Sequence, residues 1–211
     1  MSDHDAEGNR PRNRWDERYA GTDYHFGTEP NGFLRESLDR LPPGRALCIG
    51  DGEGRNAVFL AENGFAVTAM DASRVGMEKA QRLARDRGVS LETVVSDLRD
   101  YAFGHDEWDV IVSIFVHLQP ELRHDVHRRV VEALRPGGCF VIEAYTPEQL
   151  EYRTGGPPVA ELMMTLDTLA ADLAGLDFEV GREVVRDVSE GRGHRGRAAV
   201  VQVLGRKPAG G

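Results

Sequence analysis

The chain has 211 residues, of which 40% are hydrophobic and 29% are charged, a mixture typical of one globular domain with a sizeable core. Its net charge of -9 argues against general binding to nucleic acid or to an anionic membrane, because both surfaces repel an acidic protein. The sequence shows neither an apolar stretch that could span a bilayer nor the apolar segment of a signal peptide, so we expect a cytoplasmic protein.

Residues 1–12 are polar and charged and are predicted to form a flexible tail. Beyond residue 44, apolar runs with the length of strands alternate with segments of helical spacing. The predicted strands are residues 45–49, 66–70, 91–95, 108–115 and 139–145. The segments between them predict helices: one after the glycine-rich stretch at 50–54, one from Ser73 to Gly88, and one opened by Pro120 with Leu134 on its apolar face.

Strands that alternate with helices pair in parallel through right-handed crossovers, which predicts a Rossmann-like, doubly wound α/β sheet. The end of the chain has a different pattern. A helix is expected over residues 159–174, and two strand-like runs, 178–188 and 197–206, then follow with no helix between them. We therefore expect a mostly parallel sheet that ends in an antiparallel hairpin.

Cys48 and Cys139 each lie within an apolar run. This position favours two separate buried thiols over a disulfide or a metal pair, and no histidine stands near them at ligand spacing. The sequence therefore predicts no metal site.

Three glycines, Gly50, Gly52 and Gly54, follow the first predicted strand in "CIGDGEGRN". Such a turn allows a ligand to approach the backbone at the carboxyl edge of the sheet, although it can also be a simple connector. A dinucleotide fingerprint would need a further glycine at Arg55, and no Gly-Lys-Ser/Thr follows that would make a P-loop. The spacing instead favours an adenosine carrying an amino-acid tail.

Two aspartates end the next two predicted strands. Asp71 follows Gly50 by 21 positions, where a carboxylate can accept hydrogen bonds from both ribose hydroxyls. Asp97 ends the third strand, where it can accept a hydrogen bond from an adenine amino group. Each could also be a helix cap or a solvated turn residue, but together behind the glycine turn they predict a nucleoside site.

The stretches "LCIGDGEGRNAVFLA", "VTAMDAS", "VVSDL" and "LRPGGCFVIEAYTP" together resemble the class I S-adenosylmethionine-dependent methyltransferases over nearly the whole chain. The resemblance implies a seven-stranded sheet with a reversed last strand and S-adenosyl-L-methionine as cofactor. It assigns the three glycines to the methionine end, Asp71 with the adjacent Ala72 to the ribose, and Asp97 with Leu98 to the adenine.

One position departs from the family pattern. The acid expected two residues before the first glycine, which orients the methionine amino group, is replaced by Cys48. Either Glu53 or Asp51 could compensate for it, or both could face solvent.

Residues 15–34 contain five of the aromatic side chains and three glycines. They could form an amphipathic helix on the sheet, but the glycines favour a broken covering segment. The stretch resembles the N-terminal segment of the thiopurine and tellurite-resistance methyltransferases, which implies that Trp15, Arg18, Tyr24 and Phe26 lie near the methyl group. We thus divide a single domain, 13–211, into a lid (13–40), a cofactor-binding core (41–146) and a substrate-side helix and hairpin (147–207).

The predicted hairpin tip, residues 190–197, is basic. Arg192, His194, Arg195 and Arg197 could clamp an anionic acceptor, or they could be solvated turn charges. The tellurite-resistance resemblance assigns a His-Arg pair and a further arginine in this hairpin to the substrate. His117, Glu143 and Tyr145 lie at strand ends on the same edge, where each could contact the cofactor or acceptor or be purely structural.

These features predict methyl transfer to a soft nucleophile, either a thiol or a chalcogen oxyanion such as tellurite or selenite. A nicotinamide-dependent oxidoreductase and a non-catalytic S-adenosylmethionine-binding protein are the alternatives. The expected partner is a small-molecule substrate, with no nucleic acid and no membrane, and the protein could form a homodimer. A nucleobase substrate is disfavoured further because no Asn/Asp-Pro-Pro-aromatic motif follows the fourth strand.

Overall fold

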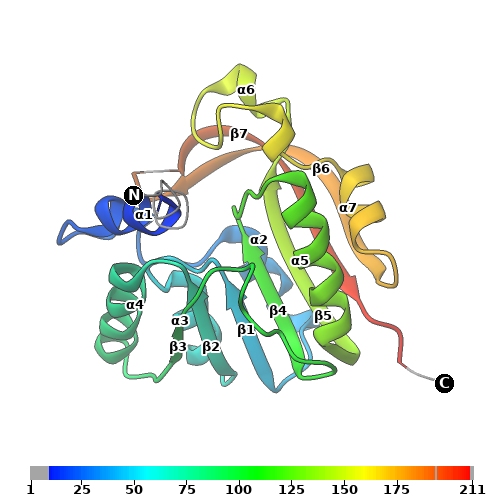
Figure 1. Cartoon of the computed structure of the whole chain (residues 1–211), viewed down its shortest axis with the longest axis horizontal. Coiled ribbons are helices and arrows are strands. Elements are labelled where there is room, and N and C mark those ends of the chain that lie inside the picture. The colour runs from blue at the N-terminus through cyan, green and yellow to red at the C-terminus, as the bar shows by residue number, and fades with distance from the viewer. Residues whose placement is uncertain (1–9, 193, 210–211) are drawn as a thin grey trace, which may run out of the picture.

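The computed structural model describes residues 10–192 and 194–209 and contains a seven-stranded sheet with strand order β3-β2-β1-β4-β5-β7-β6 (Figure 1). The strands are β1 (Arg45–Ile49), β2 (Ala66–Asp71), β3 (Glu92–Val95), β4 (Trp108–Ile114), β5 (Leu134–Tyr145), β6 (Asp177–Glu190) and β7 (His194–Arg206). β1 to β5 pair in parallel, whereas β7 lies antiparallel to both β5 and β6. The predicted fold class is confirmed.

The helical elements cover both faces and one edge of this sheet. In chain order they are α1 (Arg10–Tyr19), α2 (Gly32–Ser37), η2 (Leu38–Arg40), α3 (Arg55–Glu62), α4 (Arg74–Asp86), α5 (Pro120–Ala133), α6 (Gln149–Tyr152), η3 (Ala160–Leu162) and α7 (Leu166–Asp172). The core residues of α5 and α7 gather on one face of the sheet, and those of α2, α3 and α4 gather on the other. This arrangement makes the three layers that a doubly wound sheet requires.

Residues of β1 alternate between these two layers, because successive side chains of a strand point to opposite faces. Leu47 and Ile49 belong to the cluster under α5 and α7, whereas Ala46 and Cys48 belong to the cluster under α3 and α4. Cys48 and Cys139 are both buried free thiols, in β1 and β5 respectively, as the sequence predicts. The central strands are thus buried on both faces, which explains their unbroken apolar sequences.

Local signals in the sequence fix where several helices begin. The Ser73 hydroxyl accepts a hydrogen bond from the Gly76 amide at 3.0 Å and caps α4. Thr165 caps α7 in the same way by accepting from the Thr168 amide at 3.1 Å. Pro120 occupies the first turn of α5, where its missing N–H leaves no bond unmade.

Three predicted boundaries are wrong. Helix α1 begins at Arg10, so residues 10–12 are helical and only residues 1–9 of the predicted tail lie outside the described part of the chain. The single helix expected at 159–174 is replaced by η3 and α7, because the chain is extended at Met163 and Thr165 and the threonine starts a new helix. Leu134 belongs to β5, where it pairs with Trp108, and not to the preceding helix.

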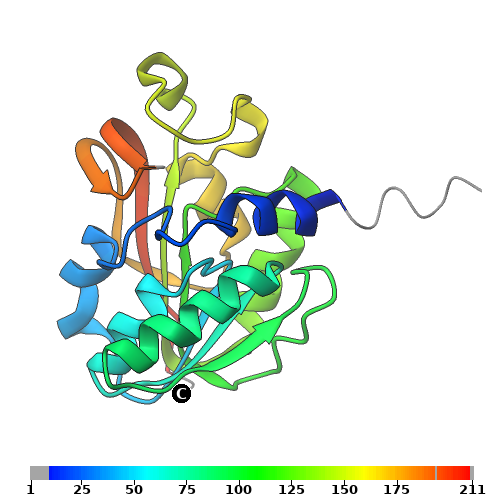
Figure 2. The same cartoon turned by 90° about the vertical axis from the view of Figure 1, so that its left-hand side faces the viewer.

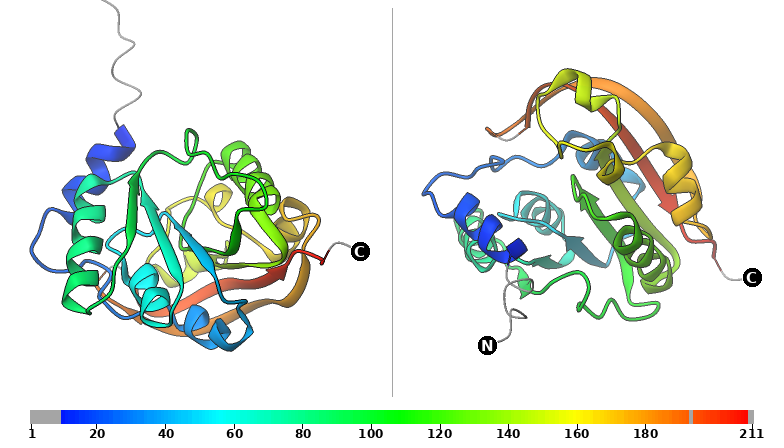
Figure 3. Two further views of the ribbon diagram at one scale, coloured as in Figure 1. Left: turned by 90° about the horizontal axis from the view of Figure 1, so that it is seen from below. Right: turned by 45° about the horizontal axis from the view of Figure 1, so that its top comes forward.

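Three segments that are distant in sequence cover the carboxyl edge of the parallel strands. These are α1 with the loop after it, the chain from α6 to η3, and the tip of the β6–β7 hairpin (Figures 2 and 3). The hairpin tip is joined to the loop after α1, since the Arg192 amide donates to the His25 carbonyl at 2.9 Å.

Over residues 10–192 and 194–209, no helix combines the length and the apolar character needed to cross a membrane. Within the same residues, no group of three or more His, Cys, Asp or Glu side chains could hold a metal ion.

Candidate active site

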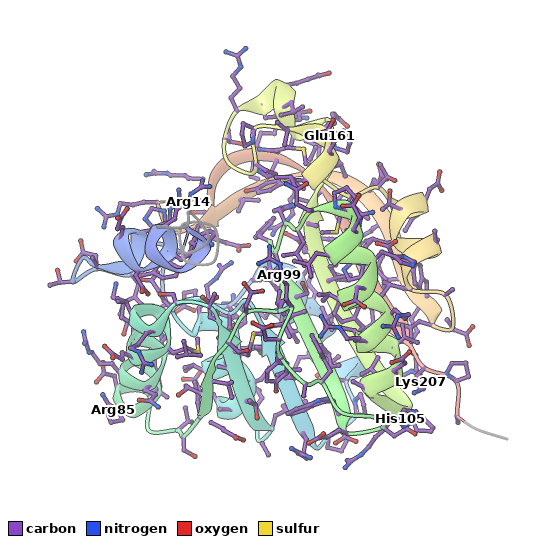
Figure 4. All side chains as sticks on the ribbon, viewed as in Figure 1. Arg14, Arg85, Arg99, His105, Glu161 and Lys207 are labelled. Carbon is purple, nitrogen blue, oxygen red and sulfur yellow. The ribbon has the colours of Figure 1, made fainter. Side chains whose placement is uncertain are left out.

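A cavity of about 860 Å³ lies at the carboxyl edge of the sheet, beneath α1 with its following loop and the chain between α6 and η3. Its wall is contributed by α1 and the loop after it, the glycine turn, the ends of β2 to β5, and the loop 155–162. A cavity of this size fits a cofactor and a small substrate together. Arg14 on α1 and Arg99 after β3 both line it, and Figure 4 shows them far from His105 and Lys207 at the other end of the molecule.

Gly50 and Gly52 line this cavity with left-handed backbones, at φ 60° and φ 63°. A Cβ on Gly50 would stand 2.6 Å from a Val116 methyl carbon, and one on Gly52 would stand 2.7 Å from the Tyr19 hydroxyl. Gly54 is not a lining residue. Its φ is 95°, and a Cβ there would stand 2.5 Å from the Ala80 Cβ, so the third glycine is needed for packing against α4.

Asp71 lies at the end of β2 and lines the cavity, as does Ala72. Its two carboxylate oxygens accept hydrogen bonds from the backbone amides of Gly52, at 2.9 Å, and Ser73, at 2.8 Å. These bonds fix the carboxylate against the glycine turn. Burial raises the pKa of Asp71, and the amides of Ser73 and Gly52 act against that increase.

Asp97 and Leu98 line the cavity beyond the end of β3. One Asp97 oxygen accepts from the Arg99 backbone amide at 2.9 Å, and the other is 3.1 Å from the Arg99 guanidinium. Leu98 is buried, and its carbonyl accepts a hydrogen bond from Arg129 at 2.6 Å. The aspartate is therefore held in a turn, and an apolar side chain lies beside it in the wall.

The N-terminal segment contributes Trp15, Arg18 and Phe26 to the cavity. Trp15 stacks on Tyr19 at a ring-centroid distance of 5.7 Å, and the Arg18 guanidinium lies 5.0 Å above the Trp15 ring. Tyr24 lies outside the lining, where its hydroxyl donates to the Lys79 carbonyl at 3.3 Å.

Glu53 holds this segment on the core. One carboxylate oxygen is 2.6 Å from the Lys79 ammonium, and the other accepts from the His25 and Phe26 amides at 2.7 and 3.3 Å. The Glu53 and Lys79 side chains are almost fully buried. Both oxygens of Glu53 are thus used within the protein, which separates it from Asp51, the other acid considered to compensate for Cys48.

Asp51 differs from Glu53, because one of its carboxylate oxygens has no partner within the described residues. In the described part of the chain, five side chains carry a buried polar atom without a hydrogen-bond partner, and three of these side chains line the cavity: Asp51 through Oδ2, Arg55 through Nη1 and His117 through Nε2. The pKa of Asp51 is raised to about 7, mainly by burial and to a lesser extent by the negative charge of Asp71, and the positive charge of Arg55 opposes this increase. A ligand cation would relieve this arrangement.

Arg55 connects the cavity to a buried ionic cluster. Its Nη2 is 2.7 Å from Glu190, and Glu190 is also 2.9 Å from Arg186, which in turn pairs with Glu143. Asn31 and Gln202 complete the cluster by donating to these carboxylates. Glu143 therefore joins the hairpin to β5 and does not line the cavity. Burial raises the pKa of Glu143, and the positive charge of Arg186 opposes this increase.

His117 and Tyr145 lie together at the ends of β4 and β5. Tyr145 stacks on His117 at 5.6 Å and on Phe115 at 4.6 Å between ring centroids. Phe115 has a left-handed backbone with φ 56°, which costs energy for a bulky residue and is typical of functional sites. His117 Nδ1 is 3.0 Å from the Leu162 carbonyl, and burial lowers the pKa of this imidazole to about 4.

The three arginines of the hairpin tip, Arg192, Arg195 and Arg197, are outside the cavity wall. Arg192 is exposed and 3.4 Å from Asp23, and the Arg197 guanidinium is exposed at 6.0 Å from the Tyr152 ring. Arg195 is also exposed, and the side chain of His194 lies outside the described residues. The predicted anion clamp is therefore not assembled among the described side chains, and it stays a prediction.

Sequence reasoning missed Arg55 as a wall residue and the whole loop 155–162. The "GGPP" at 155–158 is a turn signal that argues against a helix starting as early as residue 159. No local signal could identify Arg55, because its role depends on Glu190, which is 135 positions further along the chain.

The comparisons with known proteins agree with this geometry. A family model described as "Methyltransferase domain" matches residues 46–138. A curated cypemycin N-terminal methyltransferase from a Streptomyces species is 31% identical over 139 residues, which is 61% of this chain and 55% of that protein. The chain thus spans about half the length of the curated relatives it matches.

Solved structures share the fold over most of the chain. One, from work on the conversion of a disulfide bond into a thioacetal group during echinomycin biosynthesis, has a TM-score of 0.78 at 19% identity and covers 95% of this chain and 93% of its own. TehB from Haemophilus influenzae has a TM-score of 0.69 at 20% identity, over 93% and 66% of the two chains.

The N-methyltransferase NodS from Bradyrhizobium japonicum, in complex with S-adenosyl-L-homocysteine, has a TM-score of 0.69 at 16% identity, over 93% and 98%. Together the comparisons show a similarity to methyltransferase domains over residues 46–138 and a fold shared with solved methyltransferases, one of them in complex with S-adenosyl-L-homocysteine. These similarities favour the methyltransferase alternative over the nicotinamide-dependent one. The relatives bear the names of different substrates, so the resemblance to the tellurite-resistance group in particular is not established.

Proposed function

We propose that this protein transfers a methyl group from S-adenosylmethionine to a small soft nucleophile, a thiol or a chalcogen oxyanion, with a thiol favoured. The observation that carries this proposal is the composition of the cavity wall near β4 and β5. Phe115, Tyr145, Leu162 and Pro157 are apolar or aromatic there, and the imidazole of His117 beside them is neutral at pH 7, because burial lowers its pKa to about 4. Such a wall suits an uncharged acceptor better than a strongly hydrated oxyanion.

The unpartnered atoms of the cavity support the same cofactor. The methionine end of S-adenosylmethionine carries one carboxylate and one ammonium group. Arg55 Nη1 is a buried donor without a partner, and Asp51 Oδ2 is a buried acceptor without one, so this pair has complementary charges. We assign Asp51 to the ammonium group, in the role of the acid missing at Cys48, and Arg55 to the carboxylate.

The remaining contacts follow the strand ends. Asp71, fixed by two backbone amides, would accept from the ribose hydroxyls, and Asp97 with Leu98 would hold the adenine. When bound, the cofactor supplies an electrophilic methyl group on a sulfonium sulfur. Because in-line displacement depends mainly on alignment, Trp15, Arg18 and Phe26 act by closing the site and excluding water.

The names of the similar proteins include both sulfur and amine chemistry. The solved structure with a TM-score of 0.78 comes from work on conversion of a disulfide bond into a thioacetal group. The cypemycin relative is named as an N-terminal methyltransferase, so amine acceptors also occur among similar proteins. The cytoplasmic location, the small-molecule partner and the possible homodimer are parts of this proposal that rest on the sequence.

Two measurements test the proposal. Isothermal calorimetry with S-adenosylhomocysteine should give one site per chain, and mass spectrometry should detect methylated product from at least one compound in a panel of alkyl and aryl thiols. Absence of binding at high micromolar concentration would refute the cofactor assignment. Binding without transfer to any thiol, tellurite or selenite would favour the non-catalytic alternative.

A further inference from the structure

The protonation state of His117 follows from its contacts. The Leu162 carbonyl, 3.0 Å from Nδ1, can only accept a hydrogen bond, so the neutral ring must carry its proton on Nδ1. Nε2 then has a free lone pair. That atom is buried and has no hydrogen-bond partner, although the residue is part of the cavity wall.

The position of this imidazole is fixed by its neighbours. Tyr145 stacks on its face at 5.6 Å with an interplanar angle of 14°, and the Leu162 contact holds one edge. A proton acceptor that keeps one tautomer and one orientation is what general base catalysis requires. A histidine with a purely structural role is expected to have both ring nitrogens hydrogen-bonded, because a buried acceptor without a partner lowers the stability of the fold.

We propose that His117 Nε2 is the general base of the reaction and that the acceptor is a neutral thiol or hydroxyl compound that still carries its proton when it binds. This inference rests on the proposed function: it selects the thiol from the two acceptors proposed there, and it adds hydroxyl compounds because they have the same kind of proton to lose. It disfavours chalcogen oxyanions, whose nucleophilic selenium or tellurium atom carries no proton to give up, and it assigns the loop 155–162 a role in catalysis through the Leu162 carbonyl.

The transfer forms one bond to the methyl carbon and breaks another. The lone pair of the acceptor sulfur or oxygen forms the new bond to the methyl carbon, and the electron pair of the broken carbon–sulfur bond stays on the donor sulfur, which becomes neutral. The acceptor proton moves to His117 Nε2, and the resulting imidazolium later releases it to water. The net products are the methylated acceptor, S-adenosylhomocysteine and one proton.

The low basicity of His117 also selects among acceptors. Burial lowers its pKa to about 4, with the Leu162 carbonyl acting in the opposite direction. A weak base suffices for a thiol or hydroxyl, since their proton becomes strongly acidic as the heteroatom is methylated, whereas a methylated amine retains its proton against such a base. The other titratable groups of the cavity wall include Tyr145, Asp51 and Asp71, and none of them is among the causes of this shift.

The kinetic test compares His117→Asn with the wild type on two thiols. Benzyl mercaptan is protonated at neutral pH, and 4-nitrothiophenol is ionised. For benzyl mercaptan, kcat/KM at pH 7 should fall about 100-fold in the variant, whereas the value for 4-nitrothiophenol should change less than about 3-fold. The loss on benzyl mercaptan should shrink as the pH rises, because hydroxide then ionises the thiol in solution. An equal loss on both thiols, or no loss on either, overturns the proposal.

Binding and spectroscopy separate this proposal from the proposed function. S-adenosylhomocysteine should bind His117→Asn within about 2-fold of its wild-type affinity, which shows that the fold and the cofactor site are intact. His105→Asn is the control, because its imidazole is exposed and far from the cavity. Nitrogen NMR of the wild type should show an Nδ1-protonated ring at pH 7, and an Nε2-protonated or charged ring refutes the base. Failure of the wild type to methylate any thiol, tellurite or selenite would instead refute the proposed function.

Discussion

Two aspartates, Asp172 and Asp51, have opposite surroundings. Asp172 on α7 receives Arg123 Nε at 2.7 Å, and His124 and His127 each lie 3.1 Å away through Nδ1. Burial alone would raise the pKa of Asp172, but the hydrogen bonds from these three side chains lower it. Asp51 beside the glycine turn has an unpartnered oxygen and a second carboxylate nearby, and its pKa is raised to about 7.

This difference distinguishes a carboxylate with a structural role, Asp172, from one that is placed to bind a ligand, Asp51. Every charge around Asp172 is neutralised by the protein itself, so the group is complete without a ligand. The charge on Asp51 is only partly offset by Arg55 and one of its oxygens has no partner, which costs folding energy that a ligand cation would return. Buried polar groups with no partner in an otherwise well-paired chain therefore point to the binding site more sharply than charge density does.

The largest expected effect is on stability. Asp172→Ala should lower the free energy of unfolding by about 3 kcal/mol, because Arg123 and His127 then stay buried without their counter-charge. Urea titration measures this loss. The difference from wild type should shrink as the pH falls below about 4, since the stabilising charge of Asp172 is lost on protonation. Weaker binding of S-adenosylhomocysteine by this variant would contradict a purely structural role.

Asp71→Ala should weaken the binding of S-adenosylhomocysteine about 100-fold, through loss of charge-assisted hydrogen bonds to the ribose. Calorimetry gives the dissociation constant. Asp71 also accepts from the Gly52 and Ser73 amides, so Asp71→Asn is the matched variant that retains part of this geometry and should lose less affinity. Wild-type affinity in both variants would show that the ribose lies elsewhere.

Asp51→Asn should weaken the same binding about 10-fold at pH 8. The wild-type affinity should rise between about pH 6 and 8, as Asp51 ionises and can pair with the ammonium group, whereas the variant should lack this increase. Glu53→Gln is the control, because both Glu53 oxygens are already used by Lys79 and the lid. If the two variants had the same pH profile, Asp51 would not be the group that binds the cation.

Asp51 also makes the free energy of unfolding depend on pH. Its pKa is raised from about 3.9 in the unfolded chain to about 7, so the folded state binds the proton more tightly. Between about pH 4 and 7, wild-type stability should therefore fall relative to Asp51→Asn as the pH rises, and the difference should be constant above that window. Parallel urea titrations across this range measure the effect.

The smallest expected effect is at the hairpin tip. Arg197→Ala should change kcat/KM for a thiol acceptor less than about 2-fold, because its guanidinium is exposed and outside the cavity wall. A loss of about 10-fold or more, seen with tellurite or selenite but not with a thiol, would instead support the anion clamp predicted for this hairpin.

The sequence by itself determined the fold and the edge at which the site lies. Apolar runs of strand length, Ser73 as a cap, Pro120 at a helix start and a terminal run of strands without a helix each act over a few residues, so they can be read locally. The acids at the ends of two strands, Asp71 and Asp97, lie at one edge because parallel strands all end there.

Only the tertiary structure decided which polar groups are already paired. Glu53 and Asp51 are two positions apart in one turn, yet Lys79 and the lid use both oxygens of the first, whereas one oxygen of the second has no partner. The same holds for Glu143, which the hairpin buries beside Arg186, and for His117, whose tautomer depends on a carbonyl 45 positions away. Hydrogen bonding and burial depend on residues distant in sequence, and no local pattern records them.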